Sequence, residues 1–252
     1  MHRFYVPPDQ CRESFLTLPE EEAHHALRVL RLRRGEAATV LDGAGTELDC
    51  DVVEAGRQAV RLVVKSRRVS PPLPFQLTLL QAIPKGKLLN SIIQKATELG
   101  ASRVVPLLTA RVVTHLDEDK TDARRDHWQH VAIEAIKQCG APWLPRVEAA
   151  TTSAEFLARG EKFDLPLIAS LQPGAKHPRE HFDDFRKEHG LQPASLCVWV
   201  GPEGDFTPEE VAAVLAAGAK PITLGPLVLR SDTAAVYCLS VLSYEMQTTS
   251  LS

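Results

Sequence analysis

The stretch LCVWVGPEGDFTPEE, residues 196–210, decides the fold class of this chain. Its first five residues form an apolar run typical of a buried strand. Thr207 then signals a helix, because Thr at the N-cap, Pro at the first position and Glu at the third form a capping box. The chain must turn sharply in between, which the glycines at 201 and 204 permit. This strand-to-helix unit predicts an α/β domain.

The same alternation of strand and helix extends to both sides of this stretch. The apolar run 77–83 is followed by apolar positions at helical spacing over 88–99, and Gly100 ends that helix. A polar segment at 176–189 is expected to form a surface helix or loop. We therefore expect a parallel sheet with further strands at 104–108, 165–169 and 222–224, and further helices at 122–139, 211–217 and 234–246.

The first 70 residues have a different pattern. Short alternating runs separated by glycines predict strands of a small β-barrel, interrupted by one helix from Pro19 to Gly35. Three prolines within Pro71–Pro74 then break regular structure. We expect a domain boundary there, with a barrel domain over 1–70 and an α/β domain over 75–252.

The composition excludes membrane and secreted classes of protein. Hydrophobic residues make up 44% and charged residues 24% of the 252 residues, as in ordinary globular chains. The longest apolar runs fall far short of the roughly 20 residues that a membrane span needs. The polar opening Met1-His2-Arg3 does not indicate a secretory signal. We expect a cytoplasmic protein.

Cysteine and histidine spacing gives little sign of disulfides or metal. The five cysteines are scattered without a C-x-x-C pair, which favours reduced thiols in packed surroundings. His127 and His130 have a spacing that can bind a metal, but no third ligand completes a pattern, so no metal is expected. The formal net charge is -3, so any nucleic-acid footprint must be local.

The turn at residues 201–206 follows a strand end, where α/β proteins bind ligands. It is neither G-x-G-x-x-G nor a P-loop, and Glu203 and Asp205 would repel a phosphate, which opposes a dinucleotide oxidoreductase. A cationic adenosine compound such as S-adenosylmethionine fits better. A tight connection without any ligand fits the spacing equally well.

A second loop, residues 224–234, also lies between a strand and a helix. It is unusually apolar for a loop, and Ser231 or Asp232 is the expected N-cap of the helix that follows. Arg230 is a lone cation beside that helix start. A ligand-wrapping loop and a packed loop with a solvated arginine are both consistent with this sequence.

The two loops, GPEGDF and LGPLVLRSDTA, together resemble the signature of the bacterial ribosomal RNA small-subunit methyltransferase E family. The resemblance implies an α/β fold: a SPOUT-type parallel sheet with a C-terminal deep trefoil knot, preceded by a small PUA-like β-barrel. It also implies a homodimer without membrane or metal. Further matches spread over nearly the whole chain: Lys85-Gly86, Ile93–Gly100, Ile133-Glu134-Ala135 with Gln138, and His25 with Val29–Arg31.

The reaction that the resemblance implies is methylation of N3 of one uridine in the decoding region of 16S ribosomal RNA in the small subunit. The methyl donor is S-adenosylmethionine. The resemblance implies that the strand end at Leu171 and the two loops bind this cofactor. The loop residues implied are Gly201, Pro202, Glu203, Gly204, Leu224, Gly225, Leu229 and Ser231.

Catalytic and RNA-binding candidates follow from this chemistry. Arg230 suits stabilisation of the uracil anion, because a guanidinium is always charged and cannot be the base. Asp232 is the nearest candidate base, although an N-cap explains it as well. The candidates for RNA binding, whose alternative is a solvated helix face, are Arg3, His25, Arg28, Arg31, Lys85 and Lys87.

The sequence departs from the family pattern at two positions. Asp205 stands where a second glycine is usual, and Ala141 stands where an arginine usually follows Gly140. The first departure concerns the geometry of the loop, and the second concerns one possible RNA contact. A transfer RNA methyltransferase of the same superfamily and a non-catalytic RNA-binding assembly factor remain alternatives.

Overall fold

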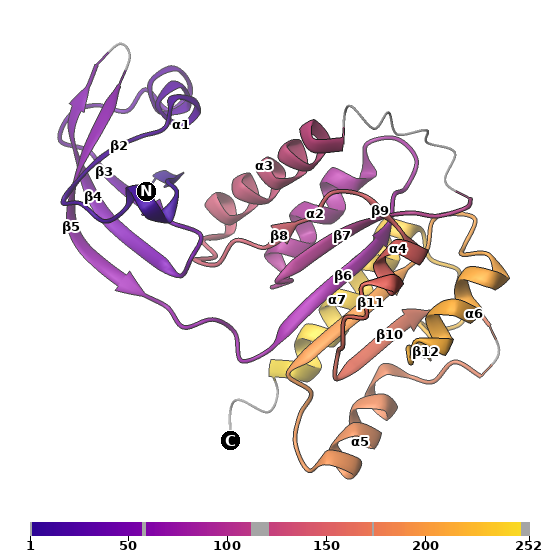
Figure 1. Ribbon diagram of the computed structural model, residues 1–252. Coiled ribbons are helices and arrows are strands. Elements are labelled where there is room, and N and C mark those ends of the chain that lie inside the picture. Colours follow the sequence, from indigo (N-terminus) through magenta and orange to yellow (C-terminus); the bar gives the residue numbers. More distant parts are fainter. Residues whose placement is uncertain (1, 57–58, 112–120, 173, 248–252) are drawn as a thin grey trace. The chain divides into compact units, whose positions relative to one another are not determined.

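The computed structural model describes residues 2–56, 59–111, 121–172 and 174–247 (Figure 1). The chain forms two compact units. The first comprises Met1–Pro72 with Ile133–Leu144, and the second comprises Leu73–Ala132 with Pro145–Ser252. The sequence pattern predicted two domains that follow one another along the chain. It did not indicate that residues 133–144 pack with the first unit.

The first unit is built on a five-stranded sheet. In β4 the apolar residues alternate with polar ones, so that Leu48, Cys50 and Val52 face the core. The strand β1 runs parallel to β3, and the other neighbours are antiparallel. This sheet is the small β domain that the sequence predicted. The order is β1 (His2–Tyr5), β3 (Ala37–Leu41), β4 (Thr46–Ala55), β5 (Val60–Val69) and β2 (Phe15–Thr17).

The helix predicted from Pro19 to Gly35 is shorter and less regular than expected. After the 3-10 turn η1 (Pro8–Gln10), the chain forms α1 (Glu20–His24) and then a π-helical turn, η2 (His25–Val29). Arg31 leaves the helix with a left-handed φ of 53°. The reversal lets Leu32 enter the core, where only 4% of its surface is exposed. The free energy gained by burying this leucine is larger than the helix preference of the arginines around it.

The second unit contains the predicted parallel sheet, whose neighbouring strands are all parallel (Figure 1). Two further strands were not predicted, because two residues give no periodic signal. The order is β12 (Lys220–Ile222), β10 (Leu165–Ala169), β11 (Ser195–Val200), β6 (Gln76–Ala82), β7 (Arg103–Leu108) and β8 (Arg146–Val147), with β9 (Thr151–Thr152) paired to β7.

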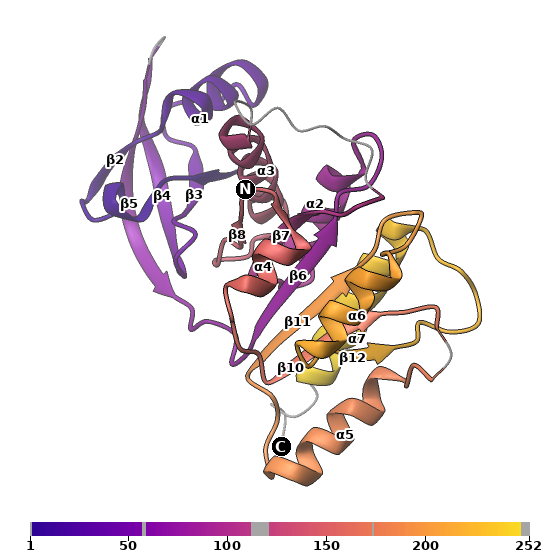
Figure 2. The same ribbon diagram turned by 45° about the vertical axis from the view of Figure 1, so that its right-hand side comes forward.

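Helices cover both faces of this sheet (Figure 2). Between the sheet and α6 and α4, Trp199 packs edge-on against Phe156 with ring centroids 5.5 Å apart. The helix α4 was not predicted, although Thr152 and Glu155 form a capping box at its start. The helices on one face are α2 (Leu88–Glu98), α5 (Pro178–His189) and α7 (Ser231–Gln247). Those on the other face are α4 (Ser153–Ala158) and α6 (Pro208–Ala216). The helix α3 (Thr121–Cys139) lies between β7 and β8 in the chain.

The strand order creates a switch point between β6 and β11. From β6 the chain continues to β7 on one side, whereas from β11 it continues to β12 on the other side, beyond β10. In open α/β sheets, ligands bind beyond the carboxyl ends of the strands at such a point. The fold therefore places the loops after β6 and β11 where a ligand is expected.

The remaining sequence expectations concern thiols, metals and membranes. Burial raises the pKa of Cys11 to about 11 and those of Cys50, Cys197 and Cys238 to about 12, so these four are packed thiols at neutral pH. Cys139 is exposed and is the exception. Among the described residues we find no cluster of three metal-ligating side chains. None of the helices in the described ranges is long and apolar enough to cross a bilayer.

Candidate active site

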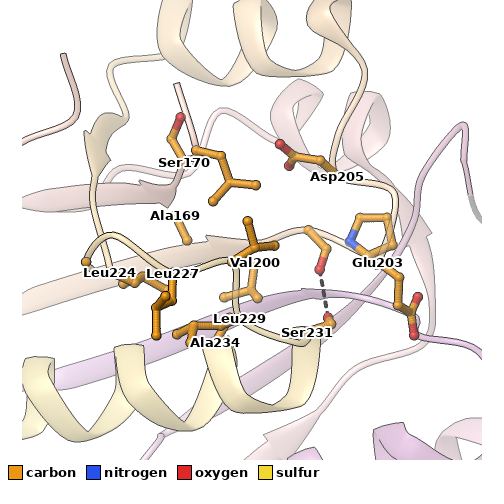
Figure 3. Close-up of a pocket in the computed structure, with 15 residues that line it drawn as sticks. Ala169, Ser170, Val200, Glu203, Asp205, Leu224, Leu227, Leu229, Ser231 and Ala234 are labelled. Carbon is orange, nitrogen blue, oxygen red and sulfur yellow. Dashed lines mark hydrogen bonds between the residues drawn. The ribbon is translucent and has the colours of Figure 1, made fainter. Parts of the chain in front are cut away.

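Three loops at the carboxyl edge of the second sheet enclose a cleft (Figure 3). They follow β10, β11 and β12, and the cleft holds ≈ 590 Å³ of space, open solvent at its mouth included. Gly204, alone of the predicted cofactor residues, lines a neighbouring cleft instead. The predicted residues that line this one are Leu171, Gly201, Pro202, Glu203, Leu224, Gly225, Leu229 and Ser231.

The walls of the cleft are largely apolar. Leu224, Leu227 and Leu229 come from the loop after β12, and Val200 ends β11 (Figure 3). Leu227 is 71% exposed, which is unusual for a leucine in a folded unit. Several lining residues were not among the predicted cofactor residues, although all of them lie at the same strand ends or in the same loops. These are Ala169, Ser170, Val200, Asp205, Leu227, Val228 and Ala234.

Ser231 ties the two loops together. Its Oγ donates to the Gly201 carbonyl at 2.7 Å (Figure 3). The same Oγ accepts from Gln81 Nε2 at 3.0 Å. Gln81 lies in β6, is fully buried, and also donates to the Ala82 carbonyl. The helix α7 begins at Ser231, so neither Ser231 nor Asp232 is the N-cap that the sequence had suggested.

The turn after β11 has a left-handed residue at Asp205. Its φ is 61°, and its N–H donates to the Pro202 carbonyl at 2.9 Å. The carboxylate Oδ1 accepts from the Phe206 N–H at 2.8 Å, which supports the strained backbone locally. Asp is one of the few residues that adopt this conformation without glycine. The departure at 205 therefore preserves the turn.

A side chain at position 201 would crowd the turn. A Cβ at this position would lie 3.0 Å from Asp205 Oδ1 and 3.4 Å from Asp205 Cα. The turn thus folds directly over Gly201. Glu203, by contrast, points away from the loop after β12 (Figure 3), and its Oε1 accepts from the Lys85 N–H at 3.3 Å.

Comparison with known proteins assigns a family to this arrangement. A family described as RNA methyltransferase PUA domain matches residues 18–65, and one described as RNA methyltransferase domain matches residues 71–243. Ribosomal RNA small subunit methyltransferase E of Bacillus subtilis is 31% identical over 98% of this chain and 98% of its own length. The protein of that name from Synechocystis is 33% identical over 95% of this chain and 76% of its own.

The chain belongs to the ribosomal RNA small subunit methyltransferase E family. Solved structures are similar to nearly the whole chain. A methyltransferase from Legionella pneumophila with bound cofactor S-adenosylmethionine has a TM-score of 0.86 and 31% identity, over 96% of this chain and 97% of its own. The family protein from Neisseria gonorrhoeae, bound to S-adenosylmethionine, has a TM-score of 0.84 and 26% identity, over 97% and 98%.

In this family member the predicted catalytic residues lie at the start of α7. Arg230 is exposed between two residues that line the cleft, Leu229 and Ser231. Within the described part of the chain, its guanidinium makes no ion pair or hydrogen bond. Asp232 is half-buried, and its Oδ1 accepts from the Thr233 N–H at 2.9 Å. Arg230 is therefore available to a substrate, whereas Asp232 is partly engaged in the helix.

The predicted RNA-binding residues fall in both units. In the first, Arg28 and Arg31 are exposed at and after η2, and His25 is half-buried. Arg3 is engaged locally, because its Nη1 donates to the carbonyls of Lys137 and Gln138 at 3.3 and 3.1 Å, at the end of α3. Its RNA-binding role stays a prediction. In the second unit, Lys85 and Lys87 are exposed beside Glu203 in the neighbouring cleft.

Replacing Ser231 with alanine is expected to weaken cofactor binding about tenfold and to lower the free energy of unfolding by about 1–3 kcal/mol. The change leaves the Gly201 carbonyl and the Gln81 amide each without one buried partner. Calorimetric titration with S-adenosylmethionine and urea unfolding measure the two effects. Ser240→Ala, an exposed serine of the same helix, is the matched control and should change neither. Unchanged cofactor affinity in the Ser231 variant would contradict the coupling of the loops.

Replacing Asp205 with glycine should leave stability unchanged to within about 1 kcal/mol, since relief of the left-handed strain is offset by greater freedom of the unfolded chain. Cofactor affinity should stay within about threefold. Asp205→Val, in contrast, is expected to destabilise the fold by about 1–3 kcal/mol, because a β-branched residue is an outlier at this φ. Thermal unfolding of the two variants side by side tests this, and equal losses would refute the account of the turn.

Proposed function

We propose that this chain transfers the methyl group of S-adenosylmethionine to N3 of a uridine in the decoding region of 16S ribosomal RNA. The observation that carries the proposal is the cleft at the carboxyl ends of β10, β11 and β12, in a chain matched by an RNA methyltransferase domain over residues 71–243. The names of the relatives support the small ribosomal subunit as the source of the RNA.

The residues of the cleft fit this cofactor. Apolar side chains of Leu224, Leu227 and Leu229 suit the adenosine, and the backbone of the turn after β11 offers polar groups to its edge. Among the described lining residues there is no Lys or Arg, whereas the Asp205 carboxylate is present, which favours a cationic ligand over a nucleotide phosphate. S-adenosylmethionine supplies a methyl group activated by a positively charged sulfonium.

The protein must help uracil N3 to lose its proton and must stabilise the resulting anion. Arg230 suits the second task, because a free guanidinium at the rim of the cleft can pair with a uracil carbonyl oxygen on which negative charge develops. Asp232 is the candidate base. Its Oδ2 is left for the proton while Oδ1 holds the Thr233 N–H. Correct placement of the nitrogen supplies a further part of the acceleration.

Recognition of the RNA is proposed to use cations of both units. Arg28 and Arg31 are exposed around η2, and Lys85 and Lys87 are exposed after β6. Such cations hold phosphates without reading sequence. The whole chain has a formal charge of only -3, so these local groups provide the attraction. His25 is proposed as a further RNA contact.

We infer a cytoplasmic homodimer. Large apolar side chains at the site and on α7 support self-association, since Val228 is 78% and Tyr244 is 60% exposed. Light scattering coupled to gel filtration measures the mass of the particle directly. A mass equal to one chain at micromolar concentration would contradict the dimer.

The test of the proposed function is transfer of labelled methyl from S-adenosylmethionine to small ribosomal subunits from a strain that lacks this protein. The expected product, after digestion of the RNA, is labelled 3-methyluridine. Transfer RNA and naked 16S RNA serve as competing substrates in parallel reactions. Label in transfer RNA alone would show that the substrate is transfer RNA and not ribosomal RNA. Cofactor binding without label in any RNA would indicate a non-catalytic RNA-binding protein.

A further inference from the structure

A second cleft lies beside the cofactor cleft in the same unit. It is lined by the loop after β6, by Arg111 after β7, by the start of α3 and by the turn after β11. It holds ≈ 1650 Å³ of space, open solvent at its mouth included, against ≈ 590 Å³ in the first. The second cleft is the larger of the two.

The two clefts meet at the turn after β11. Pro202 and Glu203 line both of them, so a molecule in the second cleft reaches the edge of the first without crossing the sheet. Both lie beyond the carboxyl ends of the strands, one on each side of the switch point between β6 and β11. The second cleft is therefore placed to hold whatever approaches the methyl donor.

The charges of the second cleft are predominantly positive. Lys85, Lys87, Arg111 and Arg124 line it, and Glu203 is the one carboxylate among its described lining residues. In the described part of the chain, Lys85, Lys87 and Arg124 have no carboxylate within ion-pair distance. Among the described residues these cations have no carboxylate partner, which favours an anionic ligand from outside.

Arg111 and Glu203 have structural tasks as well. Arg111 donates from Nη1 to the Gly204 carbonyl, which holds the loop after β7 against the turn after β11. A guanidinium has five N–H donors, so others remain for a ligand. The Glu203 carboxylate accepts the Lys85 N–H, which reduces its repulsion of an anion.

The remaining lining groups suit a nucleoside rather than a bare phosphate. Trp128 and Leu89 are buried and form an apolar floor. Asn90 Nδ2 and His127 Nε2 lie 3.0 Å apart in the same cleft, and both side chains carry groups that hydrogen-bond to a base or ribose. Cations around an apolar floor match the sugar-phosphate chain and bases of single-stranded RNA.

We propose that this second cleft binds the RNA strand next to the target uridine, with Arg124, Lys85 and Lys87 on its phosphates and Trp128 beneath a base or ribose. The proposal rests on the proposed function and adds a strand-binding site to it. The proposal thereby assigns Arg111, Arg124 and His127 to binding of the RNA substrate and not of the cofactor.

Arg124 and its neighbour Arg125 provide a matched pair for the test. Both lie in the first turns of α3, but only Arg124 lines the cleft. Arg125 is paired within its own helix, with Asp126 at 2.8 Å and Asp122 at 3.2 Å. Removal of either guanidinium takes one positive charge from the same region, so a difference between the variants reports the position and not the net charge.

The experiment measures two quantities for the wild type, Arg124→Ala and Arg125→Ala. The first is equilibrium binding of a 16S RNA fragment that contains the decoding region, at several salt concentrations. The second is the rate of methyl transfer to unmethylated small subunits as a function of subunit concentration. Calorimetric titration with S-adenosylmethionine checks that the cofactor cleft is intact in each variant.

Arg124→Ala is expected to weaken RNA binding about tenfold and to reduce the salt slope by about 1, as loss of a phosphate contact does. KM for subunits should rise in parallel, kcat should change little, and cofactor affinity should stay at the wild-type value. Arg125→Ala should resemble the wild type in every measurement.

The outcomes separate this proposal from the proposed function. If wild type methylates subunits and the two variants bind RNA equally well, the strand site is wrong while the function stands. If wild type binds RNA but transfers no methyl, and only Arg124→Ala weakens binding, the strand site stands and the function fails. A wild type that binds no RNA overturns the strand site.

Discussion

Replacing Arg230 with alanine is expected to slow methyl transfer by about 10²- to 10³-fold, the usual loss when one stabilising donor of a developing anion is removed. The guanidinium is exposed between two residues of the cofactor cleft. The described part of the chain offers it no internal partner. Its loss therefore leaves the fold intact and removes charge only where uracil becomes anionic.

The measurement is kcat for methyl transfer to small subunits, with cofactor affinity from calorimetry. Because the guanidinium is proposed to act on uracil and not on the methyl donor, affinity for S-adenosylmethionine should remain within about threefold. Arg230→Lys keeps the charge without the planar fork and should recover part of the rate. A rate within tenfold of wild type in Arg230→Ala would contradict this assignment and move attention to Asp232.

Replacing Lys137 with alanine is expected to lower the free energy of unfolding by about 3–5 kcal/mol, the cost of leaving a buried charge without its partner. Lys137 Nζ lies 2.7 Å from Glu22 Oε1 and 2.6 Å from Glu134 Oε1, all within the first unit. The side chains of Lys137 and Glu22 are each 8% exposed. Glu22 Oε2 is buried without a hydrogen-bond partner, so it depends on this ammonium group for compensation.

The pH dependence of the free energy of unfolding gives this prediction a second readout. Burial, opposed by Lys137, raises the pKa of Glu22 above its ordinary value of 4.5. Burial also lowers the pKa of Lys137, but the carboxylates of Glu134 and Glu22 outweigh it and leave that pKa raised. In Lys137→Ala the pKa of Glu22 rises further. Because the folded state then binds the proton more tightly than the unfolded state, the loss of stability is full above the folded pKa and shrinks as pH falls toward 4.5.

Urea unfolding at pH 7.5 and pH 5 measures both effects. The double variant Glu22→Leu/Lys137→Met should recover most of the stability, because an apolar pair of similar volume needs no buried charge. Lys162→Ala, an exposed lysine, is the control. Equal stability of Lys137→Ala and wild type at pH 7.5 would show that the ion pair does not stabilise the fold. A loss of stability that grows toward pH 5 would show that the charge of Glu22 is not the cause of the loss.

The sequence located the two loops that line the first cleft because their signals are local. An apolar run, a glycine turn and the capping box at Thr207 lie within 15 residues, so propensity and capping settle that unit without help from the rest of the chain. The apolar loop 224–230 was recognised for the same reason. The turn at Arg31 was missed, since its cause is the burial of Leu32, which no local pattern announces. The implied trefoil knot and the roles of the site residues stay predictions.

Sequence alone determined that this chain alternates strand and helix after residue 75, and where those strands end. Only the tertiary structure decided the order of the strands, because pairing between parallel strands depends on long-range packing and not on the residues within each strand. That order sets β11 between β6 and β10 and brings Gln81 to within 3.0 Å of Ser231, 150 residues away. The second cleft arises in the same way, from loops that share an edge of the sheet but no stretch of sequence.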